Sequence, residues 1–214
     1  MSTNFSLTYD LSYTISGNGE TSIIQKGLLT NITDQQFVSS LNLHFDSPSI
    51  ASISAYDELG PIEPQIVKKD NKTEVSLNFN KNILGIGKNW AFSLSYQNPD
   101  IVKSKIDTWE INIPKSDDSP EVIGYNVSVK VPKTFGEPVT VQPPPFKDMN
   151  WRKDQIEKVG IKLVYSKSNL SPTIVSPTPS RYLFPLLRFG PSSLIFLILL
   201  ITVGILVMKL LPKI

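Results

Sequence analysis

Apolar and polar residues alternate along the start of the chain. Residues 5–15 read Phe-Ser-Leu-Thr-Tyr-Asp-Leu-Ser-Tyr-Thr-Ile, with an apolar or aromatic residue at every odd position and a polar one at every even position. A period of two places one side on a core and the other in water, which is typical of a half-buried β-strand. Residues 16–19, Ser-Gly-Asn-Gly, suit a tight turn, so a second strand is expected over about residues 20–30.

The same alternation recurs along the next 150 residues. It covers residues 41–45, 75–79, 90–96, 109–113, 125–131 and 161–165. Turn-forming residues such as Asp, Asn, Gly and Pro separate these runs. Many short strands with one wet face predict a mainly β fold, specifically an antiparallel β-sandwich. The only helix expected outside a membrane is short, near residues 148–159.

The prolines predict where the domain ends. Pro143, Pro144 and Pro145 cannot all lie in a central strand. We therefore expect the β-sandwich domain to span residues 1–145. Residues 146–168 are expected to form a short accessory helix or strand segment, which either packs back on the sandwich or begins a further element.

A proline-rich segment follows the predicted domain. Residues 171–180 read Ser-Pro-Thr-Ile-Val-Ser-Pro-Thr-Pro-Ser. Proline denies backbone donors and favours extended, polyproline-like conformations. Residues 169–188 are therefore predicted to form a semi-rigid Ser/Thr/Pro-rich stalk.

The chain then becomes continuously apolar. Residues 189–208 contain no charge and would span roughly 30 Å as a helix, the thickness of a bilayer's hydrocarbon core. As a helix they would be apolar on every face, whereas a helix on the surface of a soluble domain has a polar face. We predict one transmembrane helix over residues 189–209, inserted in the lipid bilayer, with a short tail over 210–214. The alternative is a buried core helix.

The membrane orientation is weakly specified. Arg181 and Arg188 precede the apolar run, and Lys209 and Lys213 follow it, so the flanking charges do not choose a side. The short tail suits a large extracytoplasmic domain on a single-pass protein of the cell membrane. No signal peptide is visible at residues 1–5. Either a leader precedes this sequence, or the protein is tail-anchored and faces the cytoplasm.

Composition excludes several function classes. Lys and Arg number 21 against 19 Asp and Glu, without a basic cluster, so nucleic acid is not an expected partner. The chain has no cysteine, which excludes disulfides, thiolate metal sites and cysteine nucleophiles. Its one histidine, His44, lies on the polar side of residues 41–45 and is expected to be exposed and structural. No nucleophile-elbow motif supports a Ser-His-Asp triad. No enzyme activity, catalytic residue, cofactor or metal site is predicted.

Other candidate sites have ordinary structural interpretations. Asp57, Glu58, Asp70 and Asp117-Asp118 lack the spacing of a calcium loop and are expected to be solvated. Gly85-Ile-Gly87 precedes a strand, so it does not indicate a phosphate cradle. Candidate N-glycosylation sequons begin at Asn4, Asn31, Asn71, Asn126 and Asn169. The aromatic residues that could form a ligand platform are instead expected in the core or on strand faces; they are Tyr56, Trp90, Trp109 and Trp151.

Several local motifs resemble a known membrane-protein region. They are Ala-Tyr-Asp-Glu-Leu-Gly-Pro at 55–61, Lys-Lys-Asp-Asn-Lys-Thr at 68–73, Trp-Ala-Phe-Ser-Leu-Ser-Tyr at 90–96 with Pro-Asp-Ile at 99–101, and Trp-Glu-Ile-Asn-Ile-Pro at 109–114; residues 9–18 and 29–33 fit the same pattern. Together they resemble the extracytoplasmic N-terminal β-domain of transglutaminase-like-domain membrane proteins from uncultured bacteria. The similarity covers roughly residues 3–150.

The resemblance implies an accessory domain without its enzyme. The transglutaminase-like core depends on a Cys-His-Asp constellation, and this chain has no cysteine. The leading hypothesis is a membrane-anchored, non-catalytic surface domain that acts as a binding or spacer module for a protein or cell-envelope partner. The alternatives are an accessory subunit or remnant of a transglutaminase-like protease system, and a cytoplasm-facing tail-anchored adaptor.

Overall fold

The computed structural model describes residues 4–34, 36–115 and 121–167, which belong to one compact unit, Met1–Asn169. The predicted stalk at 169–188, transmembrane helix at 189–209 and tail at 210–214 lie outside the described residues. Within the described part the fold is mainly β, as predicted, with fourteen strands and one short α-helix. A search of that part finds no helix with the length and apolar character needed to cross a membrane.

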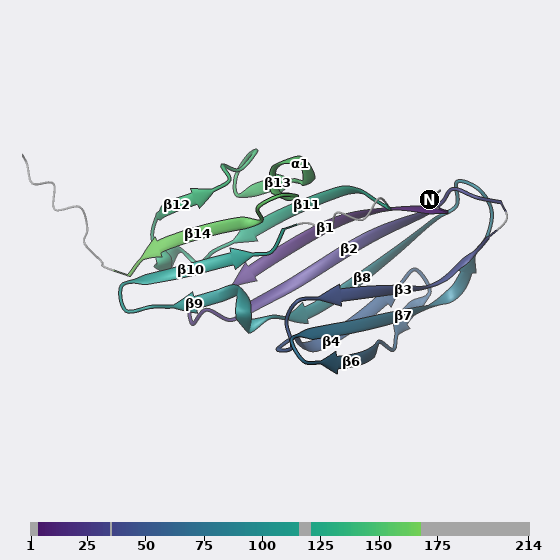
Figure 1. Ribbon diagram of the computed structural model, residues 1–214, viewed down its shortest axis with the longest axis horizontal. Coiled ribbons are helices and arrows are strands. Elements are labelled where there is room, and N and C mark those ends of the chain that lie inside the picture. Colours follow the sequence, from purple (N-terminus) through teal and green to yellow (C-terminus); the bar gives the residue numbers. More distant parts are fainter. Residues whose placement is uncertain (1–3, 35, 116–120, 168–214) are drawn as a thin grey trace, which may run out of the picture. The chain divides into compact units, whose positions relative to one another are not determined.

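A seven-stranded sheet forms the largest layer (Figure 1). Its strands, in spatial order, are β13 (Asn150–Arg152), β11 (Val122–Lys130), β1 (Phe5–Ile15), β2 (Thr21–Asn31), β8 (Asn89–Gln97), β4 (Ala51–Asp57) and β5 (Gly60–Ile62). The alternation in β1 explains its position, because Leu7, Leu11 and Tyr13 on the odd side are each at most 4% exposed. The even side carries polar residues and forms the outer face of this sheet.

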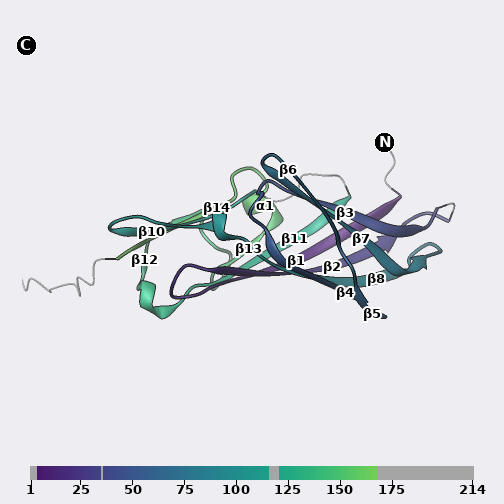
Figure 2. The same ribbon diagram turned by 90° about the horizontal axis from the view of Figure 1, so that it is seen from below.

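Two smaller sheets lie on the same side of the large sheet (Figure 2). One contains β3 (Val38–Phe45), β7 (Lys72–Ile83) and β6 (Gln65–Lys69), in that order. The other contains β12 (Pro138–Gln142), β14 (Ile161–Ser166), β10 (Thr108–Ile113) and β9 (Val102–Ser104). Aromatic contacts join the three-stranded sheet to β8, since the rings of Phe45 and Tyr96 are 5.0 Å apart and those of Phe79 and Phe92 are 5.7 Å apart.

One strand pair corrects the expectation of an antiparallel fold. Strands β1 and β11 run parallel, with Tyr9 opposite Tyr125 and Leu11 opposite Val127. The other strand pairs of the described residues are antiparallel. A period of two determines which face a side chain occupies, but carries no information about the direction of the neighbouring strand. The parallel pair arises because the chain visits both smaller sheets before it returns beside β1.

Residues 146–167 pack back on the same unit. β14 lies between β12 and β10, and β13 pairs with β11. The helix expected near residues 148–159 is a single turn, α1 (Lys153–Ile156). Trp151 is 1% exposed, and its indole N–H donates to the Pro143 carbonyl at 2.8 Å. Two short 3₁₀ helices complete the described elements, η1 (Pro99–Ile101) and η2 (Lys133–Phe135).

Candidate functional site

A groove of about 750 Å³ lies on the inner face of the seven-stranded sheet. We call it the central groove. Its floor comes from alternate residues of β1, together with residues of β2, β8 and β11: Phe5, Leu7, Tyr9, Leu11, Tyr13, Ile23, Gln25, Tyr96 and Tyr125. Successive side chains of a strand point to opposite faces of the sheet. Because the lining residues of β1 are every second residue, the groove here is bounded by one face of the sheet.

The walls of the central groove have a different pattern. Residues 41–45 of β3 and residues 112–115, at the end of β10, line it consecutively. A consecutive set means that the groove runs along the edge of a strand. Among the residues that the structure describes, β3 is an edge strand that pairs only with β7. β9 pairs with β10 only as far as Ile111, so Asn112 and Ile113 have no strand partner on that side among the described residues.

Gln25 places an amide in this apolar floor. It is 6% exposed and lies opposite Leu11 and Leu94 on the neighbouring strands. Its side chain makes no hydrogen bond with any residue that the structure describes. Among the described residues the fully buried side-chain polar atoms without a partner are Thr21 Oγ1 and Trp90 Nε1, so the amide atoms of Gln25 remain accessible from the groove and are available to a ligand there. The sequence carries a sign of this group, because Gln25 is a polar residue at an inward-facing position of β2.

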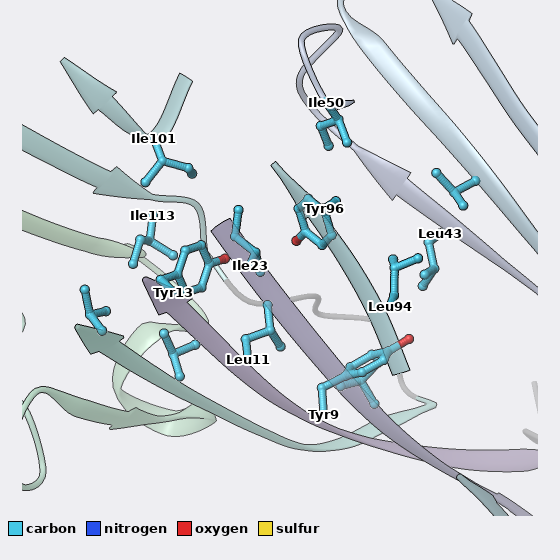
Figure 3. Packing of buried hydrophobic residues seen from close by; sticks show 14 of the residues in the cluster. Tyr9, Leu11, Tyr13, Ile23, Leu43, Ile50, Leu94, Tyr96, Ile101 and Ile113 are labelled. Atoms are coloured by element: carbon cyan, nitrogen blue, oxygen red, sulfur yellow. The ribbon is translucent and has the colours of Figure 1, made fainter. Parts of the chain in front are cut away.

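Two tyrosine hydroxyls add polar groups near Gln25. Tyr13 and Tyr96 direct their hydroxyls toward one another beside Ile23 (Figure 3). Burial raises the pKa of both tyrosines well above the ordinary value, and the neighbouring tyrosines raise each pKa further. Both side chains are therefore neutral at physiological pH. In this state a hydroxyl both donates and accepts hydrogen bonds.

Beyond Tyr96, the groove has an end that is rich in carboxylates. Ser47 donates a hydrogen bond from Oγ to Asp100 Oδ2 at 2.5 Å, and Asn98 Oδ1 accepts one from the Asp100 amide at 3.0 Å. Asp46 is exposed and lies 3.7 Å from the Lys72 ammonium. We call Asp46 and Asp100 the acidic end of the groove. At the other end lie Lys115 and Glu121, and the residues between them, 116–120, are outside the described part.

His44 lies on the rim of the groove. Its side chain is 66% exposed, and its Nδ1 is 3.9 Å from Glu74 Oε1. The predicted exposure of this residue is confirmed. The surroundings are those of a solvated surface pair on β3 and β7, and no serine is hydrogen-bonded to the imidazole within the described residues.

Two of the candidate calcium ligands, Asp57 and Glu58, support loops, and Asp70 is exposed. Asp57 accepts hydrogen bonds from the Asn80 amide at 2.8 Å, the Asn80 side chain at 2.9 Å and the Leu59 amide at 2.9 Å. Its partial burial alone would raise the pKa, but these hydrogen bonds lower it overall. Glu58 accepts from the Ala91 amide at 3.0 Å. Among the described residues no three acidic or histidine side chains form a metal cluster; Asp117 and Asp118 are not described.

The sequons and aromatic residues divide by burial. Asn31 is fully buried and donates to the carbonyls of Gln36 and Ile83, at 2.9 and 3.2 Å, so it is a structural residue. Asn126 is exposed on the outer face and donates to Asp10 at 2.9 Å. The predicted core positions of Trp90 and Trp151 are confirmed. Asn4 and Trp109 are partly exposed, and Asn71 and Tyr56 are exposed. Asn169 lies outside the described residues.

No family model and no curated protein matches this sequence. Among solved structures, the chain is similar to native leukotriene A4 hydrolase from Saccharomyces cerevisiae, with 14% identity and a TM-score of 0.48 over 76% of this chain and 29% of that one. It is also similar to the M1 zinc metallopeptidase from Deinococcus radiodurans, with 14% identity and a TM-score of 0.40 over 78% and 39% of the two chains. The chain thus spans less than two fifths of either enzyme. Its resemblance to the transglutaminase-associated domain stays a prediction.

Proposed function

We propose that this domain is a non-catalytic binding module and that the central groove is its binding site. The observation that carries the proposal is the Gln25 amide, which lies on the floor of a groove of about 750 Å³ and has no hydrogen-bond partner within the described part of the chain. Ligand pockets typically combine apolar walls with a few convergent polar groups. Gln25, Tyr13 and Tyr96 supply such groups between apolar neighbours.

The chemistry of the groove favours binding over catalysis. Its amide and its neutral hydroxyls donate and accept hydrogen bonds, and none of them is activated as a nucleophile by a neighbouring base. The chain has no cysteine and a single histidine, which is exposed beside Glu74. These residues support the binding of a ligand without its chemical conversion.

A photo-crosslinking experiment tests the binding function. p-Benzoylphenylalanine is placed at Asn42, an exposed residue that lines the groove, and separately at Val159, which is 74% exposed and does not line the groove. Irradiation of cells carrying the full chain is expected to yield a discrete adduct from position 42 and none from position 159. Equal adducts, or none from either position, would reject the groove as the binding site and favour a spacer role.

We further propose that the chain is a single-pass protein of the cell membrane. In this proposal residues 189–209 cross the bilayer, residues 169–188 form the stalk, and the large domain is extracytoplasmic. The uncharged run at 189–208 and the prolines at 171–180 support it. The absence of native cysteine allows a direct test, because Asn18 lies exposed in the turn between β1 and β2.

A single cysteine replaces Asn18, and intact cells are treated with a membrane-impermeant maleimide. Labelling before lysis is the expected result for an extracytoplasmic domain. Labelling only after lysis, with the protein in the membrane fraction, would contradict that orientation and favour a cytoplasm-facing tail-anchored adaptor.

The motif resemblance favours a second candidate function. In this alternative the domain is an accessory subunit of a transglutaminase-like protease system and positions a separately encoded catalytic chain. The motifs at 55–61, 90–96 and 109–114 support it. Co-purification of a cysteine-bearing protein with the full chain is the expected result; repeated recovery of the chain alone would count against it.

A further inference from the structure

The free edge of β3 determines what kind of ligand the central groove suits. Residues 41–45 pair with β7 on one side only, and no other backbone hydrogen bond reaches them among the described residues. Their outward N–H and C=O groups face the groove, because these residues line it consecutively. An unpaired strand edge is a template for another extended chain, which adds to it by backbone hydrogen bonds.

The floor beneath this edge suits the side chains of an added strand. Leu11 and Ile23 are buried at the groove floor, and Ile113 lies on the opposite wall (Figure 3). A strand lying beside β3 would direct every second side chain onto this surface. Apolar residues at alternate positions therefore fit the groove. The Gln25 amide lines the groove, so it can donate a hydrogen bond to, or accept one from, a polar group of the added strand.

Charge sets the orientation of the added chain. β3 runs from Val38 to Phe45 and so leads toward the acidic end, where Asp46 and Asp100 lie. A strand that runs antiparallel to β3 begins at this end. A basic residue at its first position would face both carboxylates. The structure thus combines three features of peptide recognition at one place: a free edge, an apolar floor and a charged terminus.

We propose that the central groove binds an extended peptide of a partner protein by β-strand addition to β3. The peptide runs antiparallel to β3, has apolar residues at alternate positions and carries a basic residue at its N-terminal end. This inference rests on the proposed binding function and names its ligand class. A lipid chain would fill the apolar floor but would leave both the β3 edge and the Gln25 amide without partners.

The test uses a defined peptide and the full chain in lipid nanodiscs. The probe is acetyl-Lys-Val-Thr-Val-Thr-Val-amide with a fluorophore at its C-terminal end, and its binding is measured by fluorescence anisotropy. We expect saturable binding. Replacing the peptide's Lys by Glu is expected to weaken binding about fivefold, the scale of one rim charge pair. Two further peptides carry N-methyl groups on the odd-numbered or on the even-numbered residues. Only one of these two sets of amides would face β3, so N-methylation is expected to weaken binding about tenfold for that set and little for the other.

Variants of the chain locate the peptide. Asp46→Lys is expected to weaken binding of the Lys peptide about fivefold and to restore binding of the Glu peptide. Gln25→Leu is expected to weaken binding about tenfold through the lost amide contact. Asp148→Lys is the matched control, because its side chain is 80% exposed and does not line the groove. Its affinity should equal that of the unmodified chain, and far-UV circular dichroism verifies the fold of each variant.

Several outcomes would overturn the inference. No peptide binding, together with a specific adduct from position 42, would leave the binding function standing and reject the peptide. Equal weakening by both N-methylated sets or by Asp148→Lys would reject pairing with β3. Binding of an 11-dansylaminoundecanoic acid probe that competes with the peptide and is lost in Gln25→Leu would assign the groove to a fatty acid. A doubled particle mass that Leu43→Asp abolishes would assign it to a second copy of the chain.

Discussion

Two neighbouring positions on the inner face of β2 have opposite surroundings. At Gly27 the space is full: a Cβ atom there would lie 2.2 Å from the Phe92 ring, which also contacts Phe79 with ring centres 5.7 Å apart. Two residues earlier, Gln25 faces a groove of about 750 Å³ and has no side-chain hydrogen bond within the described residues.

The contrast shows where the opening comes from. Both residues lie on one regular strand with the same register to β1 and β8, so the large sheet itself is intact at both places. The difference is the covering layer. The three-stranded sheet covers Phe92 through Phe79, whereas the groove lies between β3 of that sheet and the end of β10, above floor residues that are themselves buried. Protein interiors are otherwise close-packed. The groove therefore results from how the three sheets pack together.

Truncation at the packed position should produce the largest effect on stability. Phe92→Ala removes a 4% exposed ring from a cluster with Tyr9 and Phe79. We expect the free energy of unfolding to fall by about 3–5 kcal/mol in urea denaturation. Leu84→Ala, at a residue that is 62% exposed, is the control and should change it by less than about 0.5 kcal/mol. Equal effects of the two substitutions would mean that Phe92 is not closely packed.

The dependence of stability on alkaline pH tests the burial of the two tyrosines that line the groove. The pKa values of Tyr13 and Tyr96 are raised in the folded state, chiefly by burial, whereas an unfolded tyrosine titrates near 10. The folded state therefore keeps two protons that the unfolded state loses. Stability should be fully present below pH 10 and fall as the pH rises above it, by about 2.7 kcal/mol per pH unit for the two groups.

The double variant Tyr13→Phe/Tyr96→Phe isolates this contribution. Denaturation between pH 9 and 11 should show a shallower loss of stability than in the unmodified chain, because other titrating groups are shared by both proteins. Identical slopes would contradict the burial of these hydroxyls.

Filling the packed position should be the next largest effect. Gly27→Ala forces a methyl group against Phe92 and is expected to lower the free energy of unfolding by about 1–3 kcal/mol. In a Phe92→Leu background the ring is absent, so the same substitution should cost less. A thermal and urea double-mutant cycle measures the difference, and strict additivity would show that the two residues do not interact.

The smallest effect, and the only gain, is expected at Gln25. Gln25→Leu removes an amide without a partner and should leave the free energy of unfolding unchanged or raise it by up to about 1 kcal/mol. Asn31→Leu is the matched control at a buried amide that donates to Gln36 and Ile83. It should lower stability by about 1–3 kcal/mol. A comparable loss at both positions would mean that the Gln25 amide is bonded after all.

Strong alternation predicted much of the fold. Residues 5–15 form β1 with the expected bounds, and the runs at 41–45, 75–79 and 90–96 lie in β3, β7 and β8. The sequence does not reveal β4 or β6, because most of β4 and all of β6 lack buried residues. Backbone hydrogen bonds to β8 and β7 hold these strands, and such bonds leave no hydrophobic period.

The groove was beyond sequence reasoning for a related reason. It depends on the spacing between two sheets that cover one face, and on the parallel β1–β11 pair that no local pattern encodes. Gln25 is a visible sign, as one of the polar residues at inward positions of β2. Such a residue is equally compatible with a bonded core amide, as Asn31 shows on the same strand.

Amide hydrogen exchange along β3 tests the central claim most directly. In the full chain in nanodiscs, alternate amides of residues 41–45 are bonded to β7 and should exchange slowly, and the intervening amides, which face the groove, should exchange fast. Saturating Lys-Val-Thr-Val-Thr-Val peptide should slow only the fast set. Protection of all five amides without peptide, or no change on adding it, would contradict the claim that the free edge of β3 is the binding surface.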